Sequence, residues 1–304
     1  MDCFTRRYRY MVIMNISLKI HSKNHLIKNI LGNAEYLLSK LSLKKNQLHI
    51  INYHGTQKKF LSNFRKQLAF FKEHFLIISP QELDAFYQGK LNSMNKPLLL
   101  ISFDDGIKNN TNAAIILKEF NLKAFFFIIP DFVETPIEKQ KEYFLKNIRP
   151  SINLDIDTNL EDFNAMNWQE INNLLKDGHL VGSHTKSHTL IAKASSKTNS
   201  VIEIADSKMI IAKNLHIAPS LINVFCSINN SLESIGIKEK EIIQKNYSYH
   251  FSTLPGTNSS NSDQLFVKRI NIETHWLMGS VKYALGKWGL KKWKNRIREF
   301  ENLG

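Results

Sequence analysis

The stretch PLLLISFDDGIKNNTNAAIILKEFNLKAFFFIIP, residues 97–130, decides the fold. Its first part, PLLLISF, is apolar at almost every position, which is typical of a strand buried on both faces. Residues 113–120 have helical spacing, and AFFFII (124–129) predicts a second buried strand that Pro130 ends. A strand, a helix and a strand in this order form a βαβ unit, so the stretch predicts parallel strands and an α/β fold.

The same alternation continues on both sides of this stretch. We predict further strands at 48–54 (LHIINYH), 75–79 (FLIIS), 179–184 (HLVGSH) and 221–226, and helices at 60–71, 80–88 with Ser79 as N-cap, 168–176 and 203–215. Residues 131–165 are a charged insert for which we predict no regular structure, and 253–263 are a polar loop.

The ends of the chain differ from this middle part. Residues 1–46 are rich in Lys, Asn and Leu, and 25–43 predict a helix with poorly marked ends. Residues 280–300 place apolar side chains at nearly helical intervals among basic ones, which suits a helix packed on the domain or one lying on an anionic membrane. We therefore divide the chain into an N-terminal extension (1–46), a main domain (47–275) and a basic amphipathic C-terminal segment (276–304).

Composition restricts the class of protein. The 41 Lys and Arg against 27 Asp and Glu give a net charge of +14, which favours an anionic partner. No zinc-finger, helix-turn-helix or RNA-recognition signature accompanies this charge, so we expect no nucleic-acid partner.

The N-terminal sequence bears on the compartment. Only two cysteines are present, so a disulfide framework is not expected. The apolar patch at 11–14 is too short for a secretory signal, and no run of about 20 apolar residues is present to span a membrane. We expect a cytoplasmic protein, with peripheral contact at the inner face of the membrane as an option.

Two motifs carry candidate chemistry. Asp104 and Asp105 follow a predicted strand, at the end of a parallel sheet where catalytic groups collect, although Asp-Gly is also an ordinary turn pair. His184 and His188, in HTKSH, follow another strand and are spaced to reach one ion. Two imidazoles and a carboxylate suit a divalent cation with open positions, and the second aspartate is then available as a general base.

These residues resemble motifs of the polysaccharide deacetylases of the NodB-homology group, carbohydrate esterase family 4. SFDDG (102–106) resembles the first family motif and HTKSH (184–188) the second. The sequence that surrounds the second motif in the family is similar to residues 166–190, MNWQEINNLLKDGHLVGSHTKSHTL. The resemblance extends over about residues 48–272. It implies a distorted (β/α) barrel and a divalent metal ion, most often Zn²⁺, held by Asp105, His184 and His188, with Asp104 as the general base.

The resemblance also implies a general acid, which must give a proton to the leaving amine. Some members carry this histidine after an early strand, so His54 is our candidate and His275 the competitor. The third family motif is degenerate, because residues 224–229 read VFCSIN, without the arginine that orients the catalytic aspartate. Arg269 matches a later family position and could substitute for it in part.

The leading functional hypothesis is a metal-dependent hydrolase of carbon–nitrogen bonds other than peptide bonds, which removes acetyl groups from an N-acetylated glycan or glycolipid. One alternative is a metal-dependent hydrolase of a small amide or ester, because the identity of the metal ligands indicates the type of reaction better than it indicates the substrate. The other is a weak or inactive sugar-binding protein of the same fold, which the degenerate third motif supports.

Overall fold

The computed structural model describes residues 26–38, 45–91, 96–149, 162–191, 200–228 and 235–291. The chain divides into two compact units, one formed by residues 1–43 with 276–292 and the other by 44–275 with 293–304. The second unit contains the sheet and both sequence motifs, and it is described first.

All strand pairs of the sheet are parallel, and the strand order is β7-β6-β5-β4-β3-β1-β8. Strand β2 pairs with the first residues of β3, and β4 pairs with the last residues of β3. The strand bounds are β1 Leu48–Tyr53, β2 Leu76–Ile77, β3 Leu98–Phe103, β4 Ala124–Ile128, β5 Leu180–Ser183, β6 Val224–Cys226, β7 Tyr249–Phe251 and β8 Ile270–Asn271.

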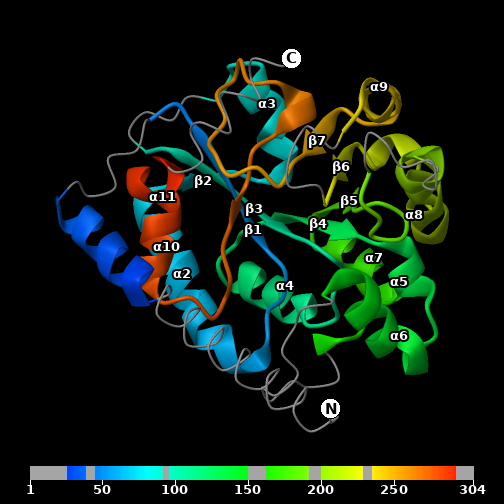
Figure 1. The fold of residues 1–304 in the computed structure, drawn as a ribbon, viewed down its shortest axis with the longest axis horizontal. Coiled ribbons are helices and arrows are strands. Elements are labelled where there is room, and N and C mark those ends of the chain that lie inside the picture. Colours follow the sequence, from blue (N-terminus) through cyan, green and yellow to red (C-terminus); the bar gives the residue numbers. More distant parts are fainter. Residues whose placement is uncertain are drawn as a thin grey trace, which may run out of the picture. The chain divides into compact units, whose positions relative to one another are not determined.

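Helices lie around the outside of these strands (Figure 1). Their bounds are α2 Leu61–His74, α3 Leu83–Tyr87, α4 Asn110–Glu119, α5 Pro130–Glu134, α6 Ile137–Tyr143, α7 Trp168–Lys176, α8 Ser207–Leu215 and α9 Ile237–Asn246. Short helical turns precede α3 at Pro80–Glu82 and α8 at Ile202–Asp206, and another follows α6 at Phe144–Ile148.

Alternate strand residues pack together inside the curled sheet. Leu48, Ile50, Leu98 and Leu100 belong to one buried cluster, which also includes side chains from β4, β6 and β7. Side chains of successive strand residues point to opposite faces, so Leu99, Ile101 and Phe103 face the surrounding helices. The next inward positions, Asn52, Ser102 and Asp104, are polar and buried. The interior therefore changes from apolar to polar toward the carboxyl ends of the strands.

The sheet curls far enough that its two edges approach each other. Phe251, the last residue of β7, forms a parallel bridge with Val267, three residues before edge strand β8 begins. The predicted distorted (β/α) barrel is therefore confirmed, as a curled and incompletely closed sheet of parallel strands.

Three local predictions were wrong. The insert at 131–165 is helical from Pro130 to Ile148, with one break at residues 135–136 between α5 and α6, because its apolar side chains Phe132, Phe144 and Ile148 cluster with Phe163. The predicted strand at 75–79 reduces to β2, since only two residues pair with β3. Helix α9 and strand β7 were not predicted. The three residues of β7 give too little alternation for a strand to be recognised.

The first unit consists, in its described part, of a helix over residues 26–38 and of helices α10 (Met278–Leu285) and α11 (Lys287–Lys291). The helix over 26–38 agrees with the middle of the one predicted at 25–43, and the remaining residues of that prediction lie outside the described part of the chain. Gly286 separates α10 from α11, and the remainder of the predicted C-terminal helix lies outside the described residues. Among the described helices, none combines the length and apolar character that crossing a membrane requires.

Candidate active site

The carboxyl ends of four strands, together with the residue before β8, bring the site residues together. Asp104 and Asp105 follow β3, His184 follows β5, and His54 follows β1. Cys226 ends β6, and Arg269 directly precedes β8. Because all these strands run parallel, residues far apart in sequence reach the same edge of the sheet.

Three side chains converge on one point beyond this edge. The Oδ1 atom of Asp105 lies 3.4 Å from Nε2 of His184 and 3.5 Å from Nε2 of His188. The three ligand atoms are close enough to one another to hold a single metal ion. The other oxygen of Asp105, Oδ2, is buried without a hydrogen-bond partner and lies 3.8 Å from Nε of Arg149, so the carboxylate lies in surroundings that favour positive charge.

Backbone carbonyls fix both imidazole rings in the orientation that a metal ligand needs. The Nδ1 atom of His184 donates to the carbonyl oxygen of Cys226 at 2.9 Å, and Nδ1 of His188 donates to that of Asn147 at 2.8 Å. A carbonyl oxygen can only accept, so each Nδ1 carries a proton and the Nε2 lone pair faces Asp105.

The backbone around this point adopts conformations that side chains other than glycine rarely take. Among the described residues five non-glycines have positive φ, and three of them are Asp105 (69°), Thr185 (62°) and His188 (62°). The turn at Asp105 and Gly106 (φ 64°) re-aims the Asp105 carboxylate, which would otherwise point away from that of Asp104. Such local strain is typical of functional sites.

Burial and charge act against each other on these groups. Burial would raise the pKa of Asp105, but the interaction with His184 and the charges of His54 and His188 lower it well below its usual value. Burial would lower the pKa of His184, but Cys226 and the aspartates raise it. The arrangement therefore stabilises positive charge between the carboxylates and the rings.

Side chains that the sequence analysis missed hold the HTKSH loop. Glu203 accepts hydrogen bonds from the backbone N–H groups of Lys186 (3.0 Å) and Ser187 (2.9 Å), and from the Ser187 hydroxyl (2.7 Å). Asp131 pairs with the Lys186 amine at 2.7 Å, and the Tyr143 hydroxyl donates to the carbonyl of Ser187. No sequence motif marks these residues.

Asp104 is held by a buried arginine. Arg269 Nη1 lies 2.7 Å from Asp104 Oδ1, and Nη2 lies 3.0 Å from Oδ2. The same guanidinium donates to Asn52 Oδ1 at 2.9 Å and to the carbonyl oxygen of Ser252 at 3.0 Å. Both ionised side chains are 2% exposed, so the bidentate pair fixes Asp104 in one orientation.

Arg269 contacts the degenerate third motif. Its Nη2 lies 2.8 Å from Sγ of Cys226, which belongs to VFCSIN. Burial would raise the pKa of Asp104, but the charges of Arg269 and His184 outweigh burial and lower it. The guanidinium thus keeps Asp104 ionised. Arg269 precedes β8, whereas the third motif lies at β6.

His54 and its competitor His275 lie in different surroundings. His54 Nδ1 is 2.9 Å from Oε1 of Glu273, and the charge of His54 acts on both aspartates. The ring of His275 packs against that of Phe60, with centroids 5.7 Å apart, and burial lowers its pKa although the charge of Glu273 acts in the opposite direction. The charge of His54 thus acts on both aspartates, whereas that of His275 acts on Glu273.

A polar network connects Asp104 to His54. Asn52 accepts from Arg269 and donates to Asn271 Oδ1 at 3.2 Å. Asn271 in turn donates to Oε1 of Glu273 at 3.2 Å, the same oxygen that faces His54. The neighbouring strands β1 and β8 place these groups side by side, since Asn52 is in register with Asn271.

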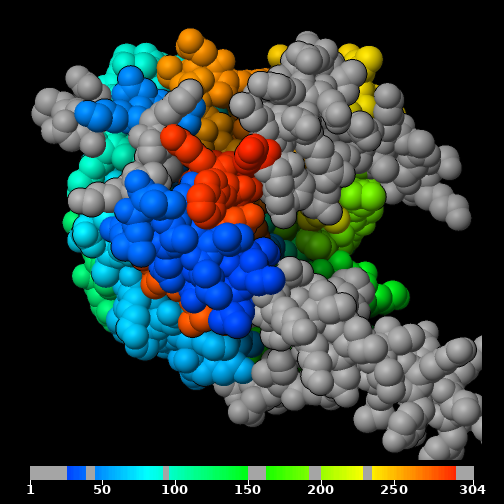
Figure 2. Space-filling model, turned by 60° about the vertical axis from the view of Figure 1, so that its left-hand side comes forward, coloured from blue at the N-terminus to red at the C-terminus, as the bar shows by residue number. Residues whose placement is uncertain are grey.

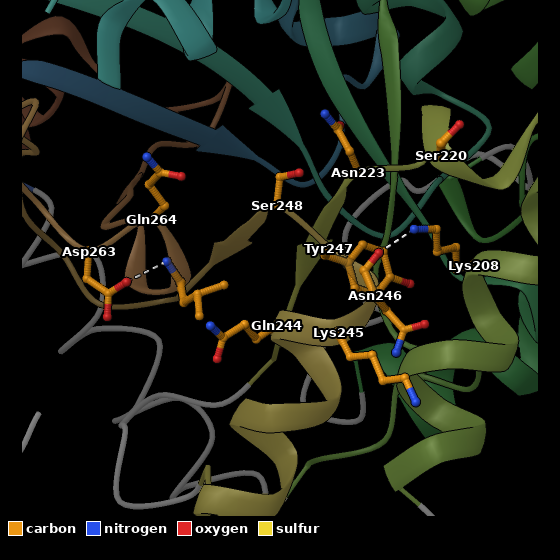
Figure 3. A pocket seen from close by; sticks show the side chains of 11 residues that line it. Lys208, Ser220, Asn223, Gln244, Lys245, Asn246, Tyr247, Ser248, Asp263 and Gln264 are labelled. Atoms are coloured by element: carbon orange, nitrogen blue, oxygen red, sulfur yellow. Dashed lines mark hydrogen bonds between the residues drawn. The ribbon is translucent and has the colours of Figure 1, made fainter. Parts of the chain in front are cut away.

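A separate polar cavity lies elsewhere. A polar cavity of about 750 Å³ is lined by Asn223, which directly precedes β6, and Ser248, which directly precedes β7, so it lies at the amino ends of these strands (Figure 3). The amine of Lys208 donates to the carbonyl of Asn246 on its wall. This cavity is separate from the aspartates and histidines, which lie at the carboxyl ends.

Comparison with known proteins agrees with the two motifs. Residues 92–228 match the family model described as polysaccharide deacetylase. This range contains Asp104, Asp105, His184 and His188, whereas His54, Arg269 and Glu273 lie outside it. No curated protein matches the chain.

Solved structures share the fold. A polysaccharide deacetylase from Bacillus cereus superposes with a TM-score of 0.57 at 19% identity, over 79% of this chain and 69% of that one. The Streptococcus pyogenes deacetylase PplD, in complex with acetate, gives 0.58 at 18% identity, over 80% and 99%. IcaB from Ammonifex degensii gives 0.57 at 18% identity, over 81% and 98%. At these identities the similarity shows the fold.

The family model and the fold therefore agree with the resemblance that SFDDG and HTKSH indicated, and residues 92–228 carry a polysaccharide deacetylase domain of the NodB-homology group.

Proposed function

We propose that this protein is a metal-dependent hydrolase that removes acetyl groups from an N-acetylated sugar of a polysaccharide, oligosaccharide or glycolipid. The observation that carries the proposal is the convergence of Asp105, His184 and His188, whose ring nitrogens are oriented in advance by backbone carbonyls. The PplD structure contains acetate, which is also the acyl product that hydrolysis of an acetamide releases.

The same three residues would hold the metal ion. Two imidazole nitrogens and one carboxylate oxygen suit Zn²⁺, and such a set leaves positions for water and substrate. A bound cation would act as a Lewis acid toward the acetamide carbonyl and would lower the pKa of water.

Asp104 would act as the general base. Its carboxylate is kept ionised by Arg269 and lies near the ring of His184, with 3.9 Å between Oδ2 and Nε2. It can accept a proton from the water that attacks the acetamide carbon. Arg269 is a positioning residue in this proposal, because it contacts Asp104 and holds its orientation.

His54 would act as the general acid. The imidazole is about one-fifth exposed, so a substrate amine can reach it, and Glu273 holds Nδ1 so that Nε2 is directed elsewhere. A histidine paired in this way can donate a proton to the leaving amine as the carbon–nitrogen bond breaks. His275 remains the competitor, and the two are distinguished by mutation below.

The metal-binding part of the proposal is tested by elemental analysis. We expect the purified protein to contain one equivalent of zinc, and an Asp105→Ala, His184→Ala double variant to contain very little. His216→Ala, which removes an exposed histidine, is the matched control and should keep its metal. Full metal content in the double variant would overturn the assignment of the ligands.

Substrate class is tested by acetate release. N-acetylhexosamine oligomers should be deacetylated, with loss of activity on chelation and recovery on addition of zinc. Turnover of simple acyl esters alone would favour a small-substrate hydrolase instead. A bound metal without turnover of any acetylated sugar would favour a sugar-binding protein.

The proposed location follows from the charge of the chain. A net charge of +14 favours peripheral contact with an anionic membrane surface. We propose a cytoplasmic protein whose substrate is a lipid-linked sugar or a glycan intermediate at the inner membrane face.

A further inference from the structure

The helix over residues 26–38 buries its polar side. Asn29 Oδ1 accepts from the backbone N–H of Gly279 at 2.8 Å, and Asn33 Oδ1 accepts from the Lys282 amine at 3.2 Å. Glu35 accepts from the backbone N–H of Trp288 at 3.2 Å. These contacts fix the polar side of this helix against α10 and α11 of the same unit.

A pair of glycines makes the packing close. A Cβ atom on Gly32 would lie 1.8 Å from the carbonyl oxygen of Gly279, so the two helices touch through their backbones at this point. Gly32 and Glu35 are the two residues of the helix that are buried. The side that faces α10 is therefore fixed by steric fit as well as by hydrogen bonds.

The opposite side of the helix is apolar and exposed. Its exposed fractions are Leu26 58%, Ile27 51%, Ile30 59%, Leu31 37%, Leu37 80% and Leu38 79%. At 3.6 residues per turn, all of these positions fall within an arc of about 140°. A surface helix of a globular protein usually has its apolar arc toward the core, so the polarity of this helix is inverted.

Neighbouring elements extend this surface with apolar and basic side chains. Leu277 is 56% exposed and Trp288 is 40% exposed, and Lys287 and Lys291 are exposed on α11. In the part of this unit that is described, residues 26–38 and 276–291, the single acidic residue is Glu35, which is 4% exposed. Figure 2 shows the helix, in blue, beside α10 and α11 in orange to red.

We propose that this apolar arc, with the flanking lysines, is a docking surface for an anionic lipid bilayer. The Leu and Ile side chains would enter the boundary between headgroups and acyl chains, while the lysines would contact lipid phosphates. The inference rests on the proposed function in one respect: a substrate linked to a membrane lipid would bring the protein to a bilayer. The surface itself is independent of the catalytic chemistry.

Length and charge select this partner. Thirteen helical residues span about 20 Å at 1.5 Å each, against about 30 Å for the hydrocarbon core, so the helix would lie in the interface. A second copy of the chain would bring the same lysines together, and like charges repel. An anionic bilayer satisfies the apolar arc and the charge at once.

The test is co-sedimentation of the full chain with vesicles. We expect binding to an equal mixture of phosphatidylcholine and phosphatidylglycerol, weaker binding to phosphatidylcholine alone, and weakening by salt. The double variant Ile30→Ser, Leu37→Ser should lower the partition coefficient by about tenfold or more, because two half-inserted side chains are lost. The control Ile115→Ser, Ile237→Ser removes side chains that are equally exposed in the other unit and should bind like wild type.

Three outcomes would overturn the proposal. One is a failed vesicle assay, in which wild type does not bind or the test and control variants lose binding equally. Another is a dimer in light scattering that the Ile30 and Leu37 substitutions dissociate, which would make the surface an interface between copies. The third is a larger fall in the free energy of unfolding for the Ile30→Ser, Leu37→Ser variant than for the control variant. This would mean that the chain itself covers the surface. Acetate release from a soluble N-acetylhexosamine oligomer should be unchanged in both variants, so failure of the proposed function is seen separately.

Discussion

Arg269 and Asp104 form a bidentate ion pair between two buried side chains, with Nη1 2.7 Å from Oδ1 and Nη2 3.0 Å from Oδ2. The arginine comes from the residue before β8, whereas the aspartate follows β3, and β1 lies between these two strands in the sheet. The guanidinium also reaches Cys226 in the degenerate third motif. Arg269 thus holds Asp104 as an ionised and oriented carboxylate, although residues 224–229 contain no arginine.

Arg269→Met should therefore destabilise the protein and impair catalysis. Removing one partner leaves a buried, uncompensated charge, so the free energy of unfolding should fall by about 3–5 kcal/mol. Asp104 would then have a raised pKa, since burial opposes its ionisation. Activity needs the ionised base, so the low-pH limb of kcat should move to higher pH. Urea unfolding and a pH–rate profile measure both effects.

A double variant separates charge from packing. Asp104→Asn alone should lower kcat by about 10²–10⁴ while the metal content stays at the wild-type level. Asp104→Asn combined with Arg269→Met should be more stable than Arg269→Met alone, because no uncompensated carboxylate remains. An additive loss of stability in the double variant would contradict the coupling.

His54→Gln should lower kcat by about 10²–10⁴ without loss of metal, and its pH–rate profile should lose the high-pH limb, because a general acid must be protonated. Glu273→Gln should have a smaller effect in the same direction, since Glu273 holds the His54 ring. His275→Gln is the matched control and should stay within about twofold of wild type. The reverse order of the two histidine variants would assign the acid to His275.

Glu203→Gln should weaken metal binding although Glu203 is not a ligand. Its carboxylate holds the backbone N–H groups of Lys186 and Ser187, between the two candidate metal-binding histidines. Loss of such support typically lowers metal affinity by about 10–100-fold. Competition with a chelator measures this affinity. Glu119→Gln, at an exposed pair with Arg65, should have no effect, and equal affinities in all three proteins would show that the loop needs no such support.

The sequence was sufficient to predict the alternation of strands and helices around SFDDG and HTKSH. Buried parallel strands read as continuous apolar runs, and β3 and β4 are of this kind. The motif residues could be predicted to meet, because they follow parallel strands directly. Strands β7 and β8 contain three and two residues, and such short segments carry no periodic signal.

The supporting contacts could not be predicted, since they depend on register and on loop paths. Glu273 reaches His54 because Asn271 is in register with Asn52, and nothing local to Glu273 indicates this. Asn147 lies in a helical segment that packs against Phe163, a residue distant from it in sequence. For residues 26–38 the helix was predictable, but which side it buries depends on α10.

Buried histidines outside the site predict a loss of stability in acid. Burial is the main reason that the pKa values of His49, His179 and His250 are lowered to about 4, below the usual value near 6.5. Between these values the unfolded chain binds protons that the folded chain does not, so stability is complete above pH 6.5 and declines as the pH falls toward 4. Each histidine should account for about 2 kcal/mol of the free energy of unfolding lost between about pH 7.5 and pH 5.

Urea unfolding at both pH values measures the loss. The variant His250→Gln should lose less stability between them than wild type, and His216→Gln, at an exposed position, should lose as much. The same loss in His250→Gln as in wild type would show that this ring binds its proton equally in both states.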